Sequence, residues 1–559
     1  MKGDFTRDTF DPLKHFSRVL MQQGRVTLDA DSNEQAAILL RYLRTYIRDM
    51  IGPYAGPFEP RGFVLSPDTE SGFLRIGAGT YYVDGILAEN EEDCLYAATE
   101  RSSLHPQPDF PVPQDDQFLV DLNSQTHSGE AYWIYLDVWE RHVTALEDDA
   151  IREAALGGPD TCTRAKVVWQ VKSAVFTDDM RRELVTSETD ALAKLNALYT
   201  QSAQLHKQFE AAAATDTATQ ISVLRQLQAM EDDLDRANRF LLRPLHEMLL
   251  SHLEPISNAS LAARVDPGQR VEDACITPPD SKYRGVENHL YRVEIHHGGH
   301  AGEATFKWSR DNGSVATSWN DTAGNDLHVS VSRGFEPGDW VELSDDTAEL
   351  LGLPGTMVKL AQVQPGILSV DPAMTVPPRG NFPHNPKVRR WNQVQTEAVA
   401  LHDGAIPVQE PAGTPTGSTL WLDIEDGIQI QFTAGGEYRT GDYWLIPARV
   451  TTGAIEWPAD DTGLAKAQPP AGIRHQYAVL GLVTWSESQL NVENIRFSFS
   501  PISFGDNFSG ASAAFITNRI NIFTRLSEIA GPAGAKPKIT KKKGATSPPP
   551  KSPRPTSKS

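Results

Sequence analysis

Short turns built from two residues that tolerate positive φ separate many strand-like runs in this sequence. Three of these turns are Asp84-Gly85, Asn312-Gly313 and Asp426-Gly427, and apolar or β-branched runs flank each one. Such a turn closes an antiparallel hairpin, because Asn, Asp and Gly adopt its left-handed backbone at low cost. The pattern therefore predicts three hairpins, which join residues 80–83 to 86–88, 304–310 to 314–319, and 420–425 to 428–432.

The density of turns also predicts the fold class. Gly (41 residues) and Pro (38 residues) modestly exceed average usage, which favours many short strands over a few long helices. Residues 131–138 and 165–172 are rich in aromatic and β-branched side chains, as is typical of buried strands. We predict a mainly β, multidomain chain of several small antiparallel β-domains, barrels or sandwiches, with an inserted α-helical hairpin and a disordered basic C-terminal tail.

Length and changes of pattern divide the chain into parts. A chain of 559 residues is longer than one compact core usually holds. The predicted parts are an N-terminal arm with an amphipathic helix (1–60), a β-domain (61–178), a helical hairpin (179–254), two further β-domains (255–380 and 381–532) and a basic tail (533–559). A short echo between residues 338–341 and 441–444, both Gly-Asp before aromatic residues, leaves open whether two of the β-domains are related.

The helix predicted in the first part carries two different stripes. Ser32 and Gln35 have the spacing of a capping box, and Gly52-Pro53 should end the helix. One stripe is apolar and the other is basic. Their members are Leu39, Leu43, Tyr46, Ile47 and Met50, and Arg41, Arg44 and Arg48.

The segment 179–254 has a helical rather than a strand period. Apolar residues recur at steps of three and four, from Leu195 to Phe209 and again from Val223 to Leu241, before Pro244. Two such helices predict an antiparallel coiled-coil hairpin, which is more often a spacer or a docking arm than a catalytic element.

Charge is distributed unevenly between the main body and the tail. The formal net charge is −21, so binding of nucleic acid by the body is not expected. Residues 531–559 contain eight basic and no acidic side chains, and residues 533–559 have too few apolar groups to fold. This tail is expected to serve as a flexible tether or as a weak electrostatic contact.

The cysteines and the N-terminal residues indicate in which cellular compartment the protein is made. The three cysteines, Cys94, Cys162 and Cys275, lie far apart and predict neither a disulfide framework nor a thiolate zinc site. The N-terminal residues have no apolar core of a signal peptide, and no run approaches the roughly 20 apolar residues of a membrane span. We expect cytoplasmic synthesis without a signal peptide.

Histidines and acidic segments are the candidates for a metal site. His289, His296, His297 and His300 are close in sequence, but neighbours on a strand point to opposite faces, and a polar strand end before Gly298-Gly299 explains them better. Residues 29–34 offer alternating oxygen donors but lack the Gly and Glu of a calcium loop, so helix capping is the preferred explanation. The sequence therefore predicts no metal ligands.

Candidate catalytic groups do not form a constellation. The acidic runs at 89–93, 147–149, 345–346 and 423–426 could supply a carboxylate pair for glycoside hydrolysis, but such runs are usually solvated faces. Neither a phosphate-binding loop nor a nucleophile elbow is found. Trp308, Trp319, Trp391 and Trp457 could stack on sugars, although core or interface roles are commoner. We therefore expect a non-enzyme without catalytic, cofactor-binding or metal residues.

Several motifs resemble one known family. It is a domain of unknown function found beside sheath, tube, spike and baseplate genes of bacterial extracellular contractile injection systems, which are related to phage tails. The matching segments are residues 1–10, 17–26, 28–31, 136–144, 155–160, 287–296, 306–313 and 438–444. The resemblance covers most of residues 1–505.

The resemblance implies a structural component at the baseplate, at its cage-like extension or at a fibre attachment point. It implies no known catalytic residues. The expected partners are baseplate, sheath or fibre subunits and further copies of this chain, while membrane or glycan contact stays open. The expected location is a phage-tail-like particle, released or membrane-associated.

Two alternatives remain for the function and two for the arm. The protein could instead be a tail-fibre-like module that binds cell-surface glycans, or a particle-associated glycan hydrolase. Residues 24–29 could lie as an extended arm on a neighbouring subunit, or form an edge strand of their own domain.

Overall fold

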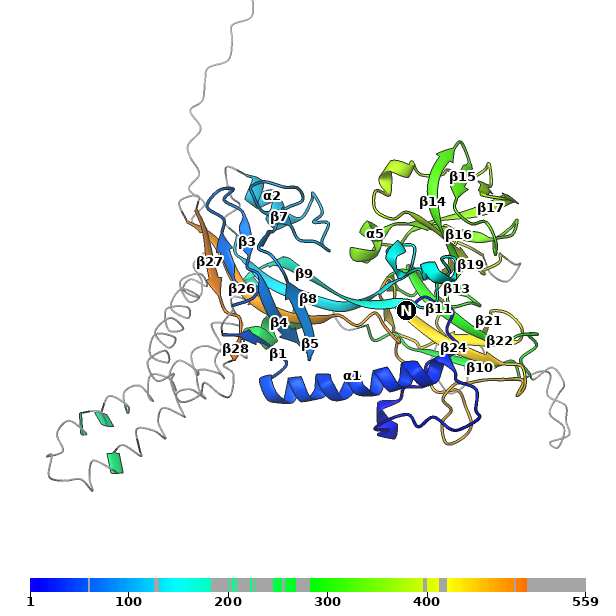
Figure 1. Cartoon of the computed structure of the whole chain (residues 1–559), viewed down its shortest axis with the longest axis horizontal. Helices are drawn as coiled ribbons and strands as arrows, with labels where there is room; N and C mark the ends of the chain where they lie inside the picture. Colours follow the sequence, from blue (N-terminus) through cyan, green and yellow to red (C-terminus); the bar gives the residue numbers. More distant parts are fainter. Residues whose placement is uncertain are drawn as a thin grey trace, which may run out of the picture. The chain divides into compact units, whose positions relative to one another are not determined.

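The computed structural model describes residues 1–58, 61–124, 130–180, 245–253, 257–267, 282–395, 400–411, 420–486 and 489–499, with isolated residues between 182 and 226 (Figure 1). The chain divides into two compact units, Met1–Phe176 with Leu242–Ser509, and Thr177–Leu241 with Gly510–Ser559. The predicted helical hairpin and basic tail lie almost wholly outside the described residues. All of the described strands belong to the first unit.

The prediction of a mainly β chain is confirmed, because the described residues form seven sheets whose strands are mostly antiparallel. Three of these sheets share one apolar core and make up the first lobe. Their orders are β28-β1-β4-β5, β2-β3-β6-β7 and β27-β26-β8-β9. The strands are β1 Tyr54–Pro57, β2 Leu65–Pro67, β3 Leu74–Ile76, β4 Gly79–Val83, β5 Ile86–Asn90, β6 Cys94–Leu95, β7 His105–Pro106, β8 Tyr132–Val143, β9 Arg164–Val175, β26 Gln476–Ser486, β27 Gln489–Asn494 and β28 Ser498–Phe499.

A second lobe has its own core, formed by the sheets β20-β13-β11-β24-β25 and β10-β22-β21. The two-stranded ladder β12-β23 belongs to the same segment of the chain. The strands are β10 Leu261–Val265, β11 His289–His297, β12 Gly299–His300, β13 Thr305–Ser309, β20 Ile406–Pro407, β21 Leu422–Asp423, β22 Ile428–Phe432, β23 Glu437–Tyr438, β24 Tyr443–Arg449 and β25 Ala454–Ile455.

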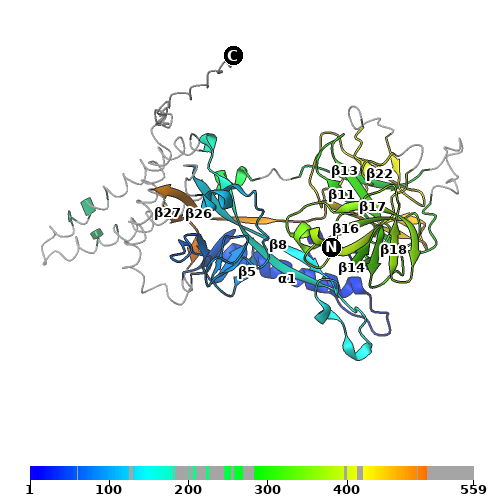
Figure 2. The same cartoon turned by 90° about the horizontal axis from the view of Figure 1, so that it is seen from above.

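Six strands close a small barrel in the order β14-β15-β18-β17-β16-β19, drawn mainly in green in Figure 2. Apolar side chains fill it, including Trp319 and Leu327. The strands are β14 Ala316–Ala323, β15 Asp326–Val329, β16 Trp340–Ser344, β17 Thr356–Gln364, β18 Ile367–Val370 and β19 Lys387–Trp391. A short helix, α5 (Asp346–Leu350), connects β16 to β17, and α2 (Gln117–Asn123) packs on the core of the first lobe.

Strand pairing links segments that the predicted domain boundaries separate. The barrel strands run across the boundary predicted at residue 380, because β19 closes the barrel by pairing with β14 and β16. β10 pairs with β22, and β26 pairs with β8 over residues 132–138. Turn residues mark only neighbouring strands, so sequence patterns carried no signal for these long-range pairs. The echo at residues 338–341 and 441–444 precedes a barrel strand in one case and an open-sheet strand in the other.

Two of the three predicted hairpins are confirmed and one is wrong. Val83 pairs with Ile86 across Asp84-Gly85, and β21 pairs with β22 across the turn that contains Asp426-Gly427. Asn312 and Gly313 do have positive φ, but β13 pairs with β11 and β20, while β14 pairs with β15 and β19. The turn at Asn312-Gly313 instead passes the chain from the second lobe into the barrel.

The N-terminal helix α1 (Asp29–Ile51) begins earlier than predicted. Its N-cap is Leu28, without a side-chain cap, so the predicted Ser32 capping box is wrong, whereas Gly52 ends the helix as predicted. The calcium-like segment is explained by contacts other than capping, since the Asp29 carboxylate accepts a hydrogen bond from the Thr6 backbone N–H at 2.8 Å. The described helices include none with the length and apolar run that a membrane span requires.

Helix α1 turns its basic stripe toward the first lobe. Arg44 pairs with Glu140 at 2.8 Å, and Arg48 pairs with Asp84 at 3.0 Å. Gly85, in the β4–β5 turn, has φ of 78°, and a Cβ at this position would overlap the Arg44 backbone. The apolar stripe is left in solvent, where Leu39, Leu43, Tyr46 and Met50 are 50–63% exposed.

We predict that Gly85→Ala lowers the free energy of unfolding by about 2–4 kcal/mol, because it combines a positive φ with an overlap against α1. Gly324→Ala is the matched control, since Gly324 has φ of 63° and open space around its Cβ position; it should cost about 1 kcal/mol. Guanidinium denaturation followed by tryptophan fluorescence measures both. Equal losses in the two variants would contradict the packing of α1 on this turn.

Candidate functional site

A buried cluster of charges lies where the N-terminal residues, the second lobe and the barrel meet. We call it the central cluster and define it as Lys2, Arg292, Glu294, Lys307 and Glu342. Arg292 and Glu294 are two residues apart on β11, so their side chains share one face of the sheet. Glu294 is directly opposite Lys307 of β13, and Glu342 comes from β16. The four strand residues are at most 4% exposed.

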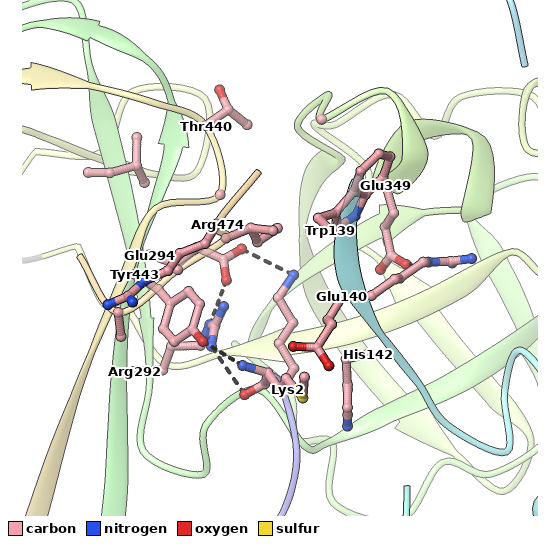
Figure 3. A pocket seen from close by; sticks show the side chains of 18 of the residues that line it. Lys2, Trp139, Glu140, His142, Arg292, Glu294, Glu349, Thr440, Tyr443 and Arg474 are labelled. Carbon is pink, nitrogen blue, oxygen red and sulfur yellow. Dashed lines mark hydrogen bonds and ion pairs between the residues drawn. The ribbon is translucent and has the colours of Figure 1, made fainter. Parts of the chain in front are cut away.

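Glu294 is the centre of this cluster. Its carboxylate contacts Arg292 Nε at 2.5 Å and Lys2 Nζ at 3.2 Å (Figure 3). It also contacts Lys307 Nζ at 3.3 Å. Lys307 also pairs with Glu342 at 2.6 Å, and Glu342 accepts a hydrogen bond from Trp391 Nε1 at 2.9 Å. Each carboxylate therefore holds groups from at least two different strands together.

The same cluster anchors the beginning of the arm. The Asn312 amide donates hydrogen bonds to the carbonyl oxygens of Met1 at 3.0 Å and Gly3 at 2.9 Å. Arg292 donates to the Met1 carbonyl at 3.3 Å and lies over the Tyr443 ring. The turn at Asn312-Gly313 therefore does not close a hairpin. It places the Asn312 side-chain amide where it binds two backbone carbonyls of the arm.

Surrounding charges outweigh burial for the two carboxylates. Burial alone raises the pKa of Glu342, but Lys307 and Lys2 lower it to about 2. The pKa of Glu294 is likewise well below its usual range, because Lys2, Arg292 and Lys307 oppose the effect of burial. His296 is the neutral member of this site, since burial and then Lys307 lower its pKa to about 3.

A second network joins the first lobe to the barrel. The Lys387 ammonium of β19 is fully buried and contacts Glu147 at 2.5 Å, Glu349 at 3.0 Å and Asp346 at 3.2 Å. Arg141 of β8 pairs with Asp346 at 2.6 Å and with Glu349 at 2.9 Å. Burial alone would lower the pKa of Lys387, but the three carboxylates raise it above its usual value.

The three carboxylates of this network lie close enough together to hold a metal ion. Their ligand atoms lie within 4.8 Å of one another. The Lys387 ammonium already contacts all three, and Arg141 contacts two of them, so these two cations balance two of the three negative charges. The arrangement is that of a structural ion-pair network.

A cavity of about 370 Å³ opens beside both networks. Lys2, Arg292 and Glu294 of the central cluster lie on one wall, and Trp139, Glu140 and His142 of β8 lie on another (Figure 3). The loops 352–355 and 471–474 complete its lining.

Two of the four candidate histidines contact each other, because the rings of His296 and His297 meet edge to face with their centroids 4.6 Å apart. His296 is buried and lies 3.4 Å from Lys307 Nζ, whereas His297 and His300 are exposed. His289 lies 3.4 Å from Asp311. A bulge between Ile295 and His297 changes the register at this strand end.

The acidic runs are divided between solvent and structural contacts. Glu89, Glu91, Glu92, Asp148, Asp149 and Asp423 are exposed, as predicted, whereas several of the other carboxylates form structural contacts. Asp93 pairs with Arg75, Asp345 caps α5, and Glu425 pairs with Arg310. Glu147 and Asp346 belong to the Lys387 network. That network could not be predicted from the sequence. Nothing in the residues around Lys387 indicates that three carboxylates from other segments surround it.

Three of the four candidate tryptophans are buried. Trp308, Trp319 and Trp391 are at most 4% exposed, which supports the core interpretation over a sugar-binding face. Trp457 is partly exposed, and its Nε1 donates a hydrogen bond to the Lys466 carbonyl.

Comparison with known proteins identifies the family. The chain belongs to DUF6519, a family of unknown function whose model matches residues 1–489. This confirms membership of a domain family of unknown function. No curated protein matches the chain. Among solved structures, a crystal structure of TssK matches with 10% sequence identity over 76% of this chain and 99% of that chain, but its TM-score of 0.17 is too low to support any conclusion.

We predict that acidification destabilises the protein in two overlapping stages. His296 has a folded pKa of about 3 against an ordinary 6.5, so its contribution is present above pH 6.5 and is lost as pH falls toward 3. Glu342 has a folded pKa of about 2 against 4.5, so its contribution is lost between pH 4.5 and 2. Between pH 6.5 and 4.5, the free energy of unfolding should fall by about 2 kcal/mol less in the His296→Gln variant than in the original protein. The substitution His300→Gln, at an exposed histidine, should not change this fall. Denaturation at stepwise pH measures this, and the same pH dependence in both variants would contradict it.

We predict that Lys387→Ala lowers the free energy of unfolding by about 3–5 kcal/mol, because it leaves buried carboxylates facing one another. Lys166→Ala removes a more exposed ion pair with Asp109 and should cost about 1 kcal/mol or less. Calcium should raise the unfolding midpoint of the Lys387→Ala variant and leave the original protein unchanged. Stabilisation of the original protein by calcium would contradict the assignment of Lys387 as the resident cation.

Proposed function

We propose that this protein is a non-catalytic structural subunit of a phage-tail-like contractile injection particle, in the region of the baseplate, its extension or a fibre attachment point. It would be made in the cytoplasm and assembled into that particle with baseplate, sheath or fibre subunits and further copies of itself. The observation that carries the proposal is the apolar surface of the arm and α1. Motif resemblance across most of the chain supports the type of particle.

Exposed apolar side chains are concentrated in this small part of the molecule. Of the 23 large hydrophobic side chains that are exposed in the described residues, 13 lie within residues 1–51. A patch of this kind on a folded protein usually marks a contact with another macromolecule. We call it the arm–helix surface. Its members are Met1, Leu13, Phe16, Leu20, Met21, Val26, Leu28, Leu39, Leu40, Tyr42, Leu43, Tyr46 and Met50.

The arm is held in place although it contributes little to either core. Its beginning is anchored by Asn312, and its later residues bind α1 through Thr9 Oγ1 to Glu34 at 2.6 Å and the Val19 N–H to Gln35 at 2.8 Å. Residues 24–28 form no strand in the structure, so the edge-strand alternative is wrong. An ordered extended segment with exposed apolar groups supports the alternative of an arm laid on a neighbouring subunit.

Charge and length indicate what kind of partner would fit. Residues 12–28 include Lys14, Arg18 and Arg25 and no acidic residue, all three being exposed. The 23 residues of α1 present a rod of roughly 35 Å. A protein surface with an apolar centre and an acidic rim would complement this surface, and its length suits an interface of standard size.

The carboxylates of the two ion-pair networks support a structural role over catalysis. The carboxylates of both networks each hold a lysine or an arginine, so none of them is placed as an unengaged general acid or base. The glycan-binding alternative is weakened by burial of Trp308, Trp319 and Trp391.

We predict that the double substitution Leu43→Asp with Tyr46→Asp abolishes incorporation into particles. Both side chains are more than half exposed, so the free energy of unfolding should change by about 0.5 kcal/mol or less. Two charges placed in an apolar interface should weaken association by about 100-fold or more. Quantitative mass spectrometry of particles purified from the encoding strain measures the amount of this chain relative to the sheath protein.

Val286→Asp is the matched control, because Val286 is 90% exposed and lies outside the arm–helix surface. It should be incorporated normally. Deletion of the gene should yield particles that lack peripheral baseplate density. Absence of the original protein from purified particles, or normal incorporation of the double variant, would contradict the proposal.

A further inference from the structure

The cavity in Figure 3 is unusual in its charge for a protein with a formal net charge of −21. Seven cationic and six acidic side chains line it, an excess of one positive charge. Its volume of about 370 Å³ is in the range of small-ligand pockets. The cationic residues are Lys2, Arg44, Arg141, Arg292, Lys307, Arg389 and Arg474, and the acidic residues are Asp84, Glu140, Glu147, Glu294, Glu342 and Glu349.

Most of these charged side chains form ion pairs with one another, but two guanidinium groups have no carboxylate partner among the described residues. Arg389 on β19 is 5% exposed and donates a hydrogen bond to the Gly313 carbonyl, yet no described carboxylate lies within ion-pair distance of it. Arg474 is exposed in the loop 471–474 and forms no ion pair within the described part of the chain. A buried cation without a counter-ion is costly, so Arg389 favours an anion from outside the chain, and the exposed Arg474 is a second cation in the same lining that could contact it.

Neighbouring groups respond to this excess of positive charge. Burial, and then the terminal amine and Arg389, lower the pKa of His142 to about 3. Burial and the charges of Arg389 and Lys307 also lower the pKa of Lys2, although Glu294 opposes them. Both groups line the cavity, so an anion bound there would offset part of the repulsion between these positive charges.

The rest of the lining limits the chemistry of that anion. Ile86, Trp139, Leu353 and Ile473 provide apolar wall, so an apolar group next to the charge would be accommodated. Six acidic side chains in the same lining would repel a dianion such as phosphate, whereas one carboxylate matches the single excess charge. Carboxylate geometry also suits guanidinium donors.

We propose that this cavity binds one carboxylate carried on an apolar group, with Arg389 and Arg474 as its charged contacts. The carboxylate could belong to a free small acid or to the C-terminus of a peptide, since the two present the same chemistry. The cavity shares Met1 with the arm–helix surface, but ligand binding to it needs no partner subunit, so it can be tested on the isolated full-length protein.

The test compares matched ligand pairs by isothermal titration calorimetry and by the thermal unfolding midpoint. Phenylacetate is paired with neutral phenylacetamide, and a tetrapeptide ending in Phe is paired with the same peptide amidated. At least one acid should bind saturably and raise the midpoint, and its amide should do neither. The acid that binds more tightly identifies the source.

Two variants assign the binding to the cavity. Arg474→Ala should weaken binding of the acid about tenfold, whereas Arg474→Lys should retain more of it. Arg333→Ala is the control, because Arg333 is exposed on the barrel and does not line the cavity. Binding of neither acid, equal binding of acid and amide, or equal effects of the Arg474→Ala and Arg333→Ala substitutions would overturn the proposal.

Discussion

The fully paired carboxylate of Glu294 is the interaction on which the rest of this structure depends. It brings together one cation from the arm, one from its own strand β11 and one from β13. A buried carboxylate is stable only when such partners compensate the loss of water. Because the three cations come from different segments, satisfying this one group fixes the position of the arm against the second lobe, and Lys307 extends the constraint to Glu342 in the barrel.

This constraint explains how an apolar arm stays ordered without a core of its own. Asn312 and Glu294 hold residues 1–3, and the acidic first turns of α1 hold Thr6 and Thr9. Arg44 and Arg48 of the basic stripe of α1 form ion pairs with Glu140 and Asp84, and the apolar stripe faces solvent. The ion pairs and hydrogen bonds that hold the arm and α1 against the body therefore also leave their apolar side chains exposed to solvent.

Sequence patterns predicted most of the local structure, except the hairpin at Asn312-Gly313 and the capping box at Ser32, and predicted long-range structure poorly. The turns at Asp84-Gly85 and Asp426-Gly427, the end of α1 at Gly52 and the long strands β8 and β9 are set by neighbouring residues, and all could be predicted. The pairing of β26 with β8 could not, because these segments are more than 300 residues apart. Neither network could be predicted, because the sequence does not distinguish a buried lysine such as Lys387 from a lysine on the surface.

The central claim is that the arm–helix surface is an assembly interface. Hydrogen–deuterium exchange of residues 12–28 tests it most directly, measured by mass spectrometry on the isolated protein and on purified particles. These residues are almost all exposed in the isolated chain, so their amides should exchange rapidly there. The account predicts strong protection of this segment in the particle. Equally rapid exchange in both states, in particles that contain the protein, would contradict it.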